Sequence, residues 1–290
     1  MNRTYHIEKE LGSGGSGAVY LAWHKRLRKH VVIKVVKNNG TGTIEVRRNE
    51  VEALKKIKNM HIPLVLDFLT ENNYSFTVME YIEGESFDKI MKYGHRFSIK
   101  KIITWYFQLA SALNVIHEYD ICHRDIKPAN IMLTKNGDVC LIDFNSALVT
   151  GNNTGIISRS MGYASPEQYE YFKLCRGLTA DAVMAYSDFI ETILLVGDCR
   201  TDLVSGLSTR KNTEVKEIDW KLSDIYSLAA TMYHFMTGKR PPVKADEIAK
   251  ISNLNGYPKS ILTIIEKSMR TNPHERYASA EEIKNALRKI

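Results

Sequence analysis

Residues 123–130 read His-Arg-Asp-Ile-Lys-Pro-Ala-Asn, and residues 141–145 read Leu-Ile-Asp-Phe-Asn. These two segments place two acids and an amide, Asp125, Asn130 and Asp143, close together in the chain. Phosphoryl transfer from a triphosphate needs such a set: one acid meets the acceptor hydroxyl, while a second acid and an amide hold the metal ions that neutralise the phosphates. The spacing therefore predicts that the three side chains point into a single cleft.

The composition is that of an ordinary globular chain. Of its 290 residues, 44% are hydrophobic and 25% are charged, which allows a substantial core in one large domain or two lobes. Forty Lys and Arg residues against 33 Asp and Glu residues give a net charge of +7, which favours anionic ligands such as nucleotides; a merely basic protein is the alternative. The basic residues are spread along the chain, so nucleic acid is not expected as a partner.

Cysteine spacing and hydropathy indicate the compartment. The four cysteines lie far apart and form no Cys-x-x-Cys pair, which predicts neither a disulfide framework nor a zinc site and favours a reducing compartment. The first residues lack an apolar signal segment, and the most apolar stretch, residues 190–196, is too short to cross a bilayer. We therefore expect a cytoplasmic chain without a membrane partner.

Hydrophobic periodicity changes along the chain. Residues 5–37 alternate between apolar and polar positions, which predicts antiparallel strands, and apolar residues between Val46 and Ile57 recur at helical spacing. Two further strands are expected before Tyr81. After Gly84 the pattern becomes helical, and the expected helices cover residues 99–119, 222–237 and 258–269.

Two more motifs precede the catalytic stretch. Gly12, Gly14 and Gly17 lie between two predicted strands, which argues against a dinucleotide-binding fold and favours a hairpin whose backbone closes over phosphates; a flexible turn is the alternative. Lys34 follows three apolar residues in a predicted strand. A buried cation is unfavourable there unless a carboxylate and phosphates meet it.

The ordered motifs resemble those of the protein kinase family, and Lys127, two residues after the catalytic aspartate, is similar to the serine/threonine class. The resemblance implies an α+β, bilobal protein kinase fold. A small β-rich N-lobe with one regulatory helix would cover residues 1–83, and a larger α-helical C-lobe would cover residues 84–290. Residues 162–168 are similar to bacterial members of the family, so a bacterial origin is expected.

The resemblance assigns roles to individual residues. Asp125 would accept or orient the proton of the acceptor hydroxyl, and Lys127 would steady the γ-phosphate. Lys34 would hold the phosphates and pair with Glu50 on the helix. Asn130 and Asp143 would bind magnesium, or manganese in its place. Glu45 and Glu52 are the rival partners for Lys34, although both are more typical of a helix surface.

ATP would lie between the two lobes. The residues expected to bind it come from the glycine-rich hairpin, the neighbouring strand, the segment joining the lobes and the floor of the base pocket, and they are Gly12, Gly14, Gly17, Val19, Val32, Lys34, Met79, Glu80, Ile82 and Met132.

Further positions match the family's scaffold. Ser160 would tie the peptide-binding segment to the catalytic loop, Glu167 would pair with Arg276, and Asp224 would bind the catalytic-loop backbone. Two positions depart from the family: Asn145 replaces a glycine, and Ser165 replaces an alanine.

The resemblance implies a protein substrate with a Ser or Thr acceptor. Arg124 corresponds to a residue that pairs with a phosphorylated activation segment in many relatives, so autophosphorylation is expected at Thr154 or Ser158, with Thr150 behind them; an unmodified segment is the alternative. The other function classes are a nucleotide-binding pseudokinase that serves as an interaction platform and a small-molecule phosphotransferase. Lys127 and Ser160 disfavour the latter.

Residues 172–219 are longer than the matching segment of the family. Apolar residues between Asp181 and Val196 fall on one helical face, which predicts one or two extra helices. This insert would either pack against its own lobe or provide a docking or self-association surface.

Overall fold

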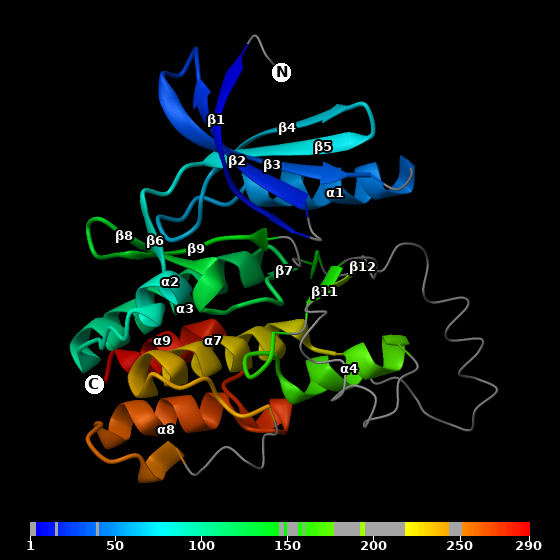
Figure 1. Ribbon diagram of the computed structural model, residues 1–290. Coiled ribbons are helices and arrows are strands. Elements are labelled where there is room, and N and C mark those ends of the chain that lie inside the picture. Colours follow the sequence, from blue (N-terminus) through cyan, green and yellow to red (C-terminus); the bar gives the residue numbers. More distant parts are fainter. Residues whose placement is uncertain are drawn as a thin grey trace, which may run out of the picture.

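A five-stranded antiparallel sheet forms the N-terminal part of the computed structural model (Figure 1). Its strands, in the order β1-β2-β3-β5-β4, are β1 (Tyr5–Gly14), β2 (Gly17–His24), β3 (Lys29–Lys37), β4 (Val65–Glu71) and β5 (Tyr74–Glu80). The structure describes residues 4–14, 17–38, 41–144, 148–149, 156–158, 160–176, 192–194, 218–243 and 251–290. The strands predicted from the alternating pattern are confirmed.

Strand β3 is the centre of this sheet and is covered on both faces. Val31 and Ile33 are fully buried in a small core with Val78 of β5. The helix α1 (Thr41–Lys55) lies against the sheet, as Figure 1 shows, and buries Val51 and Leu54. The sequence of a strand that is covered on both faces is a continuous run of apolar residues, which is why three apolar residues precede Lys34.

The C-terminal part is mostly helical. Its helices are α2 (Phe87–Lys92), α3 (Ile99–Glu118), α4 (Pro166–Arg176), α7 (Trp220–Thr237), α8 (Lys259–Ser268) and α9 (Ala280–Leu287). The three helices predicted from periodicity are confirmed as α3, α7 and α8. Together with the sheet above them, they form the bilobal α+β arrangement; the boundary between residues 83 and 84 stays a prediction.

Short strands and turns line the junction between the two parts. A three-stranded sheet in the order β6-β8-β9 contains β6 (Gly84–Ser86), β8 (Ile131–Thr134) and β9 (Val139–Leu141). Strand β7 (Ile121–Cys122) pairs with β10 (Leu148–Val149). The 3-10 turns are η1 (Pro128–Asn130), η4 (Ile251–Asn253) and η5 (Pro273–Glu275).

Local signals in the sequence fix the ends of the long helices. The Ser98 hydroxyl accepts a hydrogen bond from the backbone N–H of Lys101 at the start of α3, and Asp219 caps α7 in the same way. Helix α7 ends at Gly238, whose φ of 67° lies in the left-handed region that glycine adopts without steric cost. These caps satisfy backbone groups that the helices themselves leave without partners.

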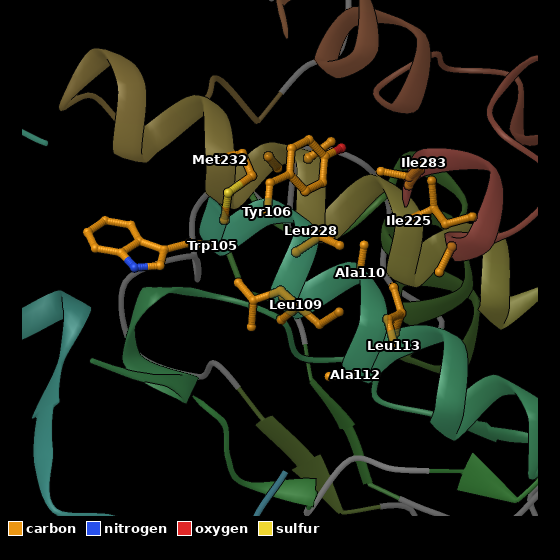
Figure 2. Packing of buried hydrophobic residues seen from close by; sticks show 14 of the residues in the cluster. Trp105, Tyr106, Leu109, Ala110, Ala112, Leu113, Ile225, Leu228, Met232 and Ile283 are labelled. Carbon is orange, nitrogen blue, oxygen red and sulfur yellow. The ribbon is translucent and has the colours of Figure 1, made fainter. Parts of the chain in front are cut away.

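Helices α3 and α7 form the main core, where their apolar side chains face one another (Figure 2). Leu109 and Leu113 of α3 and Ile225 and Leu228 of α7 are all at most 1% exposed. Each such side chain contributes roughly 1.5–3 kcal/mol when it is removed from water. The core is therefore large enough to hold α7 in place as a support for the site.

The helix predicted from the apolar spacing between Asp181 and Val196 is wrong at residues 192–194. Thr192–Leu194 forms a strand, β12, which pairs antiparallel with β11 (Ile156–Ser158), whereas the apolar spacing predicted a helix there. Two β-branched residues favour the extended conformation, and pairing with another apolar segment overrides the helical pattern. Most of the insert lies outside the described residues, as do Asn145, Thr150 and Thr154.

A buried ion pair joins α4 to the C-terminal region, as predicted. The guanidinium of Arg276 donates to both carboxylate oxygens of Glu167, at 2.6 and 2.8 Å, and also to the backbone oxygen of Leu222. The side chain of Arg276 is fully buried. Loss of one partner leaves the other charge buried without compensation.

We expect Arg276→Met to lower the free energy of unfolding by about 3–5 kcal/mol, because Glu167 would remain desolvated without its cation. Urea denaturation followed by circular dichroism measures the change. Arg288→Met is the matched control, since Arg288 forms an exposed pair with Glu281. Equal midpoints for the two variants would contradict the prediction.

Candidate active site

The carboxylate of Asp224 holds the catalytic loop. It lies in α7, is fully buried, and accepts hydrogen bonds from the backbone N–H groups of His123 and Arg124, both at 2.7 Å. His117 of α3 also bonds to it at 3.0 Å. The predicted contact between Asp224 and the loop backbone is confirmed, and it fixes the direction in which the next residue, Asp125, points.

The same region contains three potential metal ligands. His117, Cys122 and Asp224 have ligand atoms within 4.8 Å of one another. The Asp224 carboxylate is already occupied by hydrogen bonds, and burial raises the pKa of the Cys122 thiol well above its usual range. Because metals bind the thiolate and not the thiol, we interpret this cluster as part of the scaffold.

Asp125, Lys127 and Ser160 form a connected group. The Ser160 hydroxyl donates to Asp125 Oδ1 at 2.7 Å, and Lys127 Nζ donates to Ser160 Oγ at 2.9 Å. Lys127 Nζ also lies 3.1 Å from Asp125 Oδ2. The predicted tie between the peptide-binding segment and the catalytic loop is thus confirmed.

Electrostatics keep Asp125 ionised. Burial alone would raise the pKa of its carboxyl, but the nearby Lys127 ammonium and the hydrogen bond from Ser160 outweigh that effect, and the pKa lies below its usual value. An ionised carboxylate can accept a hydrogen bond from an incoming hydroxyl.

Asn130 joins the two loops that carry the acids. Its Nδ2 donates to the backbone oxygen and to Oδ2 of Asp125, at 2.8 and 2.9 Å, and its backbone oxygen accepts from Ile142 at 2.9 Å. Among the described residues, no hydrogen bond engages its side-chain oxygen. That oxygen therefore remains available as a ligand for a hard cation.

Lys34 and Asp143 meet, although 109 positions separate them in the chain. Lys34 Nζ lies 3.0 Å from Asp143 Oδ1, and Lys34 is only 7% exposed. Burial lowers the pKa of Lys34, while Asp143 acts against that change. The structure thus brings together the lysine and the acid that the sequence assigned to one cleft.

The predicted ion pair between Lys34 and Glu50 is not formed. The described part of the chain gives Lys34 one acidic partner, Asp143. Burial raises the pKa of Glu50 to about 7, and the cations that oppose this rise are Arg124 and Arg47. Arg47, one turn before Glu50 on α1, is the helix residue whose charge acts on Lys34. The orientation of α1 therefore places the arginine, and not the carboxylate, toward the lysine.

The predicted nucleotide-binding residues lie on neighbouring strands. Gly12 and Gly14 of β1 pair with Val19 and Gly17 of β2, Val19 pairs with Lys34, and Val32 pairs with Met79. Glu80 ends β5, Ile82 lies in the connection that follows it, and Met132 lies on β8. Gly17 has a φ of 119°, and an added Cβ would lie 2.3 Å from the Val35 oxygen, so only glycine fits there.

Phe144 and Gln168 complete the surroundings. The Phe144 ring contacts His123, with ring centroids 4.9 Å apart. Gln168, which sequence reasoning missed, is 1% exposed, donates to the backbone oxygen of Arg124 at 2.8 Å and accepts from Ser223 at 3.2 Å. Its place at the end of the stretch 162–168, directly after Glu167, is the signal that could have suggested its role.

Comparison with known proteins agrees with this geometry. Residues 5–176 match the protein kinase domain. The chain belongs to the protein kinase family. The chain is 30% identical over its whole length to a probable serine/threonine-protein kinase of Clostridium acetobutylicum and 28% identical to one of Clostridium perfringens. It is 26% identical, over 96% of its length, to the serine/threonine-protein kinase PrkC of Bacillus subtilis.

The chain spans about two-fifths of the length of these relatives, 40%, 38% and 39% respectively. Within its described residues, no helix combines the length and apolar character that crossing a bilayer requires. The match supports the general use of ATP and a divalent metal.

The raised pKa of Glu50 predicts a pH dependence of stability. Between its ordinary value of 4.5 and about 7, the folded kinase binds more protons than the unfolded chain, so stability falls as pH rises. Glu50→Gln removes this ionisation. We expect the free energy of unfolding of wild type minus that of the variant to fall by about 2 kcal/mol from pH 4.5 to pH 7.5.

Urea midpoints at half-unit pH intervals measure this difference. The matched control is Glu45→Gln, which changes an exposed residue of the same helix. A difference that stays flat for Glu50→Gln, or that rises with pH, would contradict the assignment.

Proposed function

We propose that this chain transfers the γ-phosphoryl group of ATP to serine or threonine hydroxyls of proteins. The observation that carries the proposal is the connected group of Asp125, Lys127 and Ser160, next to the paired Lys34 and Asp143. Phosphoryl transfer asks the protein mainly for positioning and charge neutralisation. The side chains that would provide positioning and charge neutralisation are held in place by hydrogen bonds to one another.

ATP and a magnesium ion suit the residues present. Lys34 is a buried cation beside a strand hairpin rich in glycine, which favours a polyphosphate. Asp143 and Asn130 each offer a hard oxygen donor, the type that magnesium prefers and that manganese also accepts. A bound divalent ion would neutralise charge on the phosphates.

Asp125 would orient the acceptor hydroxyl, since its carboxylate is ionised and already accepts a hydrogen bond from the Ser160 hydroxyl. Lys127, 2.9 Å from the same hydroxyl, would steady the γ-phosphate as it moves toward the acceptor.

A protein acceptor is favoured over a small alcohol. The segment that begins at Ser160 is anchored by the Glu167–Arg276 pair and by Gln168, so it can support an extended peptide beside Asp125. A nucleotide-binding interaction platform is the second candidate, prompted by Asn145 and Ser165. Ser165 is fully buried and bonded to Ser223 at 2.8 Å, which makes it a packing substitution.

We expect Asp125→Asn to lower the rate of phosphate transfer by about 10³-fold or more, with little change in nucleotide affinity, because the amide cannot take the proton. Transfer of radiolabelled phosphate to a generic protein acceptor and fluorescence titration with a nucleotide analogue measure the two quantities. Asp120→Asn, at an exposed turn, is the control. Nucleotide binding without any transfer by wild type would favour the platform.

Autophosphorylation is expected between residues 145 and 160, at Thr150, Thr154 or Ser158. The physical reason is that Arg124, a cation that is only 4% exposed, lies beside the catalytic aspartate, where an added phosphate would gain charge-assisted hydrogen bonds. Mass spectrometry of the ATP-treated kinase detects the modification. The Asp125→Asn variant should lack it, and an unmodified wild-type segment would refute the expectation.

A further inference from the structure

The segment that starts at Ser160 leads to an exposed cation. Gly162, with a φ of 80°, packs so closely against residues 240–241 that an added Cβ would lie 2.4 Å from the Pro241 oxygen and 2.9 Å from Arg240 Cγ. The guanidinium of Arg240 lies 5.7 Å from the centre of the Tyr163 ring. Because Arg240 itself is exposed, its charge is presented to solvent beside the segment that is tied to Asp125.

Arg240 is the dominant charge beside Tyr163. The Tyr163 hydroxyl lies 2.5 Å from His234 Nδ1, and burial, assisted by Arg240, lowers the pKa of His234 to about 4. His234 is therefore neutral near pH 7 and adds no charge beside Tyr163. Asp88 also acts on Tyr163, but its effect on the Tyr163 pKa is smaller than the opposite effect of Arg240.

Other charged groups nearby do not cancel this charge. Arg96 donates to the Thr237 oxygen at 2.7 Å and approaches Gly238, and Lys239 is exposed beside Arg240. Arg240 and Lys239 are thus consecutive exposed cations, and the acid that acts on Tyr163, Asp88, has a weaker effect there than Arg240. An anionic side chain of a substrate would thus be attracted to this place.

A short stretch of chain joins the catalytic group to the residue that Arg240 contacts. Ser160 bonds to Asp125, and the Tyr163 backbone N–H donates to the Ser160 oxygen at 3.0 Å, so the Cα atoms of Ser160 and Tyr163 lie within about 10 Å of each other. An extended peptide with its acceptor hydroxyl at Asp125 covers the same length in about three residues.

We propose that Arg240 is a specificity-determining residue, which selects protein substrates that carry an Asp or Glu two or three positions from the acceptor Ser or Thr. The inference rests on the proposed kinase function and names its substrate class. A guanidinium can receive a carboxylate through two parallel hydrogen bonds, which gives direction as well as attraction.

A positional peptide library tests this proposal, with kcat/KM measured for acidic, neutral and basic residues at each of four positions on either side of the acceptor. We expect wild type to prefer an acidic residue at one of the two named distances by about tenfold. Arg240→Ala should lose the preference while keeping its rate on a neutral peptide, and Arg240→Glu should prefer Lys or Arg at the same position. Lys239→Ala, a change of the neighbouring exposed cation, is the matched control and should keep the acidic preference.

The outcomes separate the two proposals. If wild type transfers phosphate to no peptide and no protein, the kinase function fails and the specificity fails with it. If wild type is active but shows no acidic preference, or if Arg240→Ala keeps that preference, the specificity alone is overturned. Urea midpoints of the Arg240 variants show whether each is folded. Arg240→Lys keeps the positive charge but cannot form the two parallel hydrogen bonds of a guanidinium, so it should retain part of the acidic preference.

Discussion

The hydrogen bonds from two consecutive backbone N–H groups to Asp224 are the constraint on which the site depends. They hold Arg124 at a φ of 62°, a left-handed conformation that costs a residue with a Cβ roughly 1–2 kcal/mol. A buried carboxylate can stabilise this conformation because the loop donors and His117 compensate its own desolvation. The direction of Asp125 thus follows from a residue 99 positions away, in a helix that is itself fixed by packing against α3.

The same helix also holds the segment after Ser160. Ser223, next to Asp224, bonds to Ser165 and Gln168, while the Leu222 oxygen accepts from Arg276, which in turn binds Glu167. One turn of α7 therefore positions both the catalytic loop and the segment that faces it. A displacement of α7 would move both together, so the contact between Asp125 and Ser160 is protected from small shifts.

Sequence reasoning succeeded where chemistry demanded a partner. The motifs assigned Lys34 and Asp143 to one cleft, where they meet, although Glu50 was the partner predicted for the lysine. The family resemblance supplied the pairs Glu167–Arg276 and Asp224 with the loop. The sequence did not predict which of two similar positions on a helix packing would turn toward the site. Arg47 and Glu50 lie three residues apart on α1, so a modest rotation of the helix decides which one faces Lys34, and no local pattern records that rotation. Thr192–Leu194 illustrates the same limit, because strand pairing depends on a distant segment.

The charges around Lys34 explain why a polyanion suits this cleft. Burial and the nearby Arg47 both disfavour the charged ammonium. Asp143 and, less strongly, Asp125 oppose them, while Glu50 is acted on by Arg124 and Arg47. Phosphate oxygens beside Lys34 would add the negative charge that α1 does not supply in this orientation, and so would favour the ammonium form. A neutral ligand would not supply this missing negative charge beside Lys34. The electrostatics of the cleft thus select for phosphates independently of the motif spacing from which the site was first predicted.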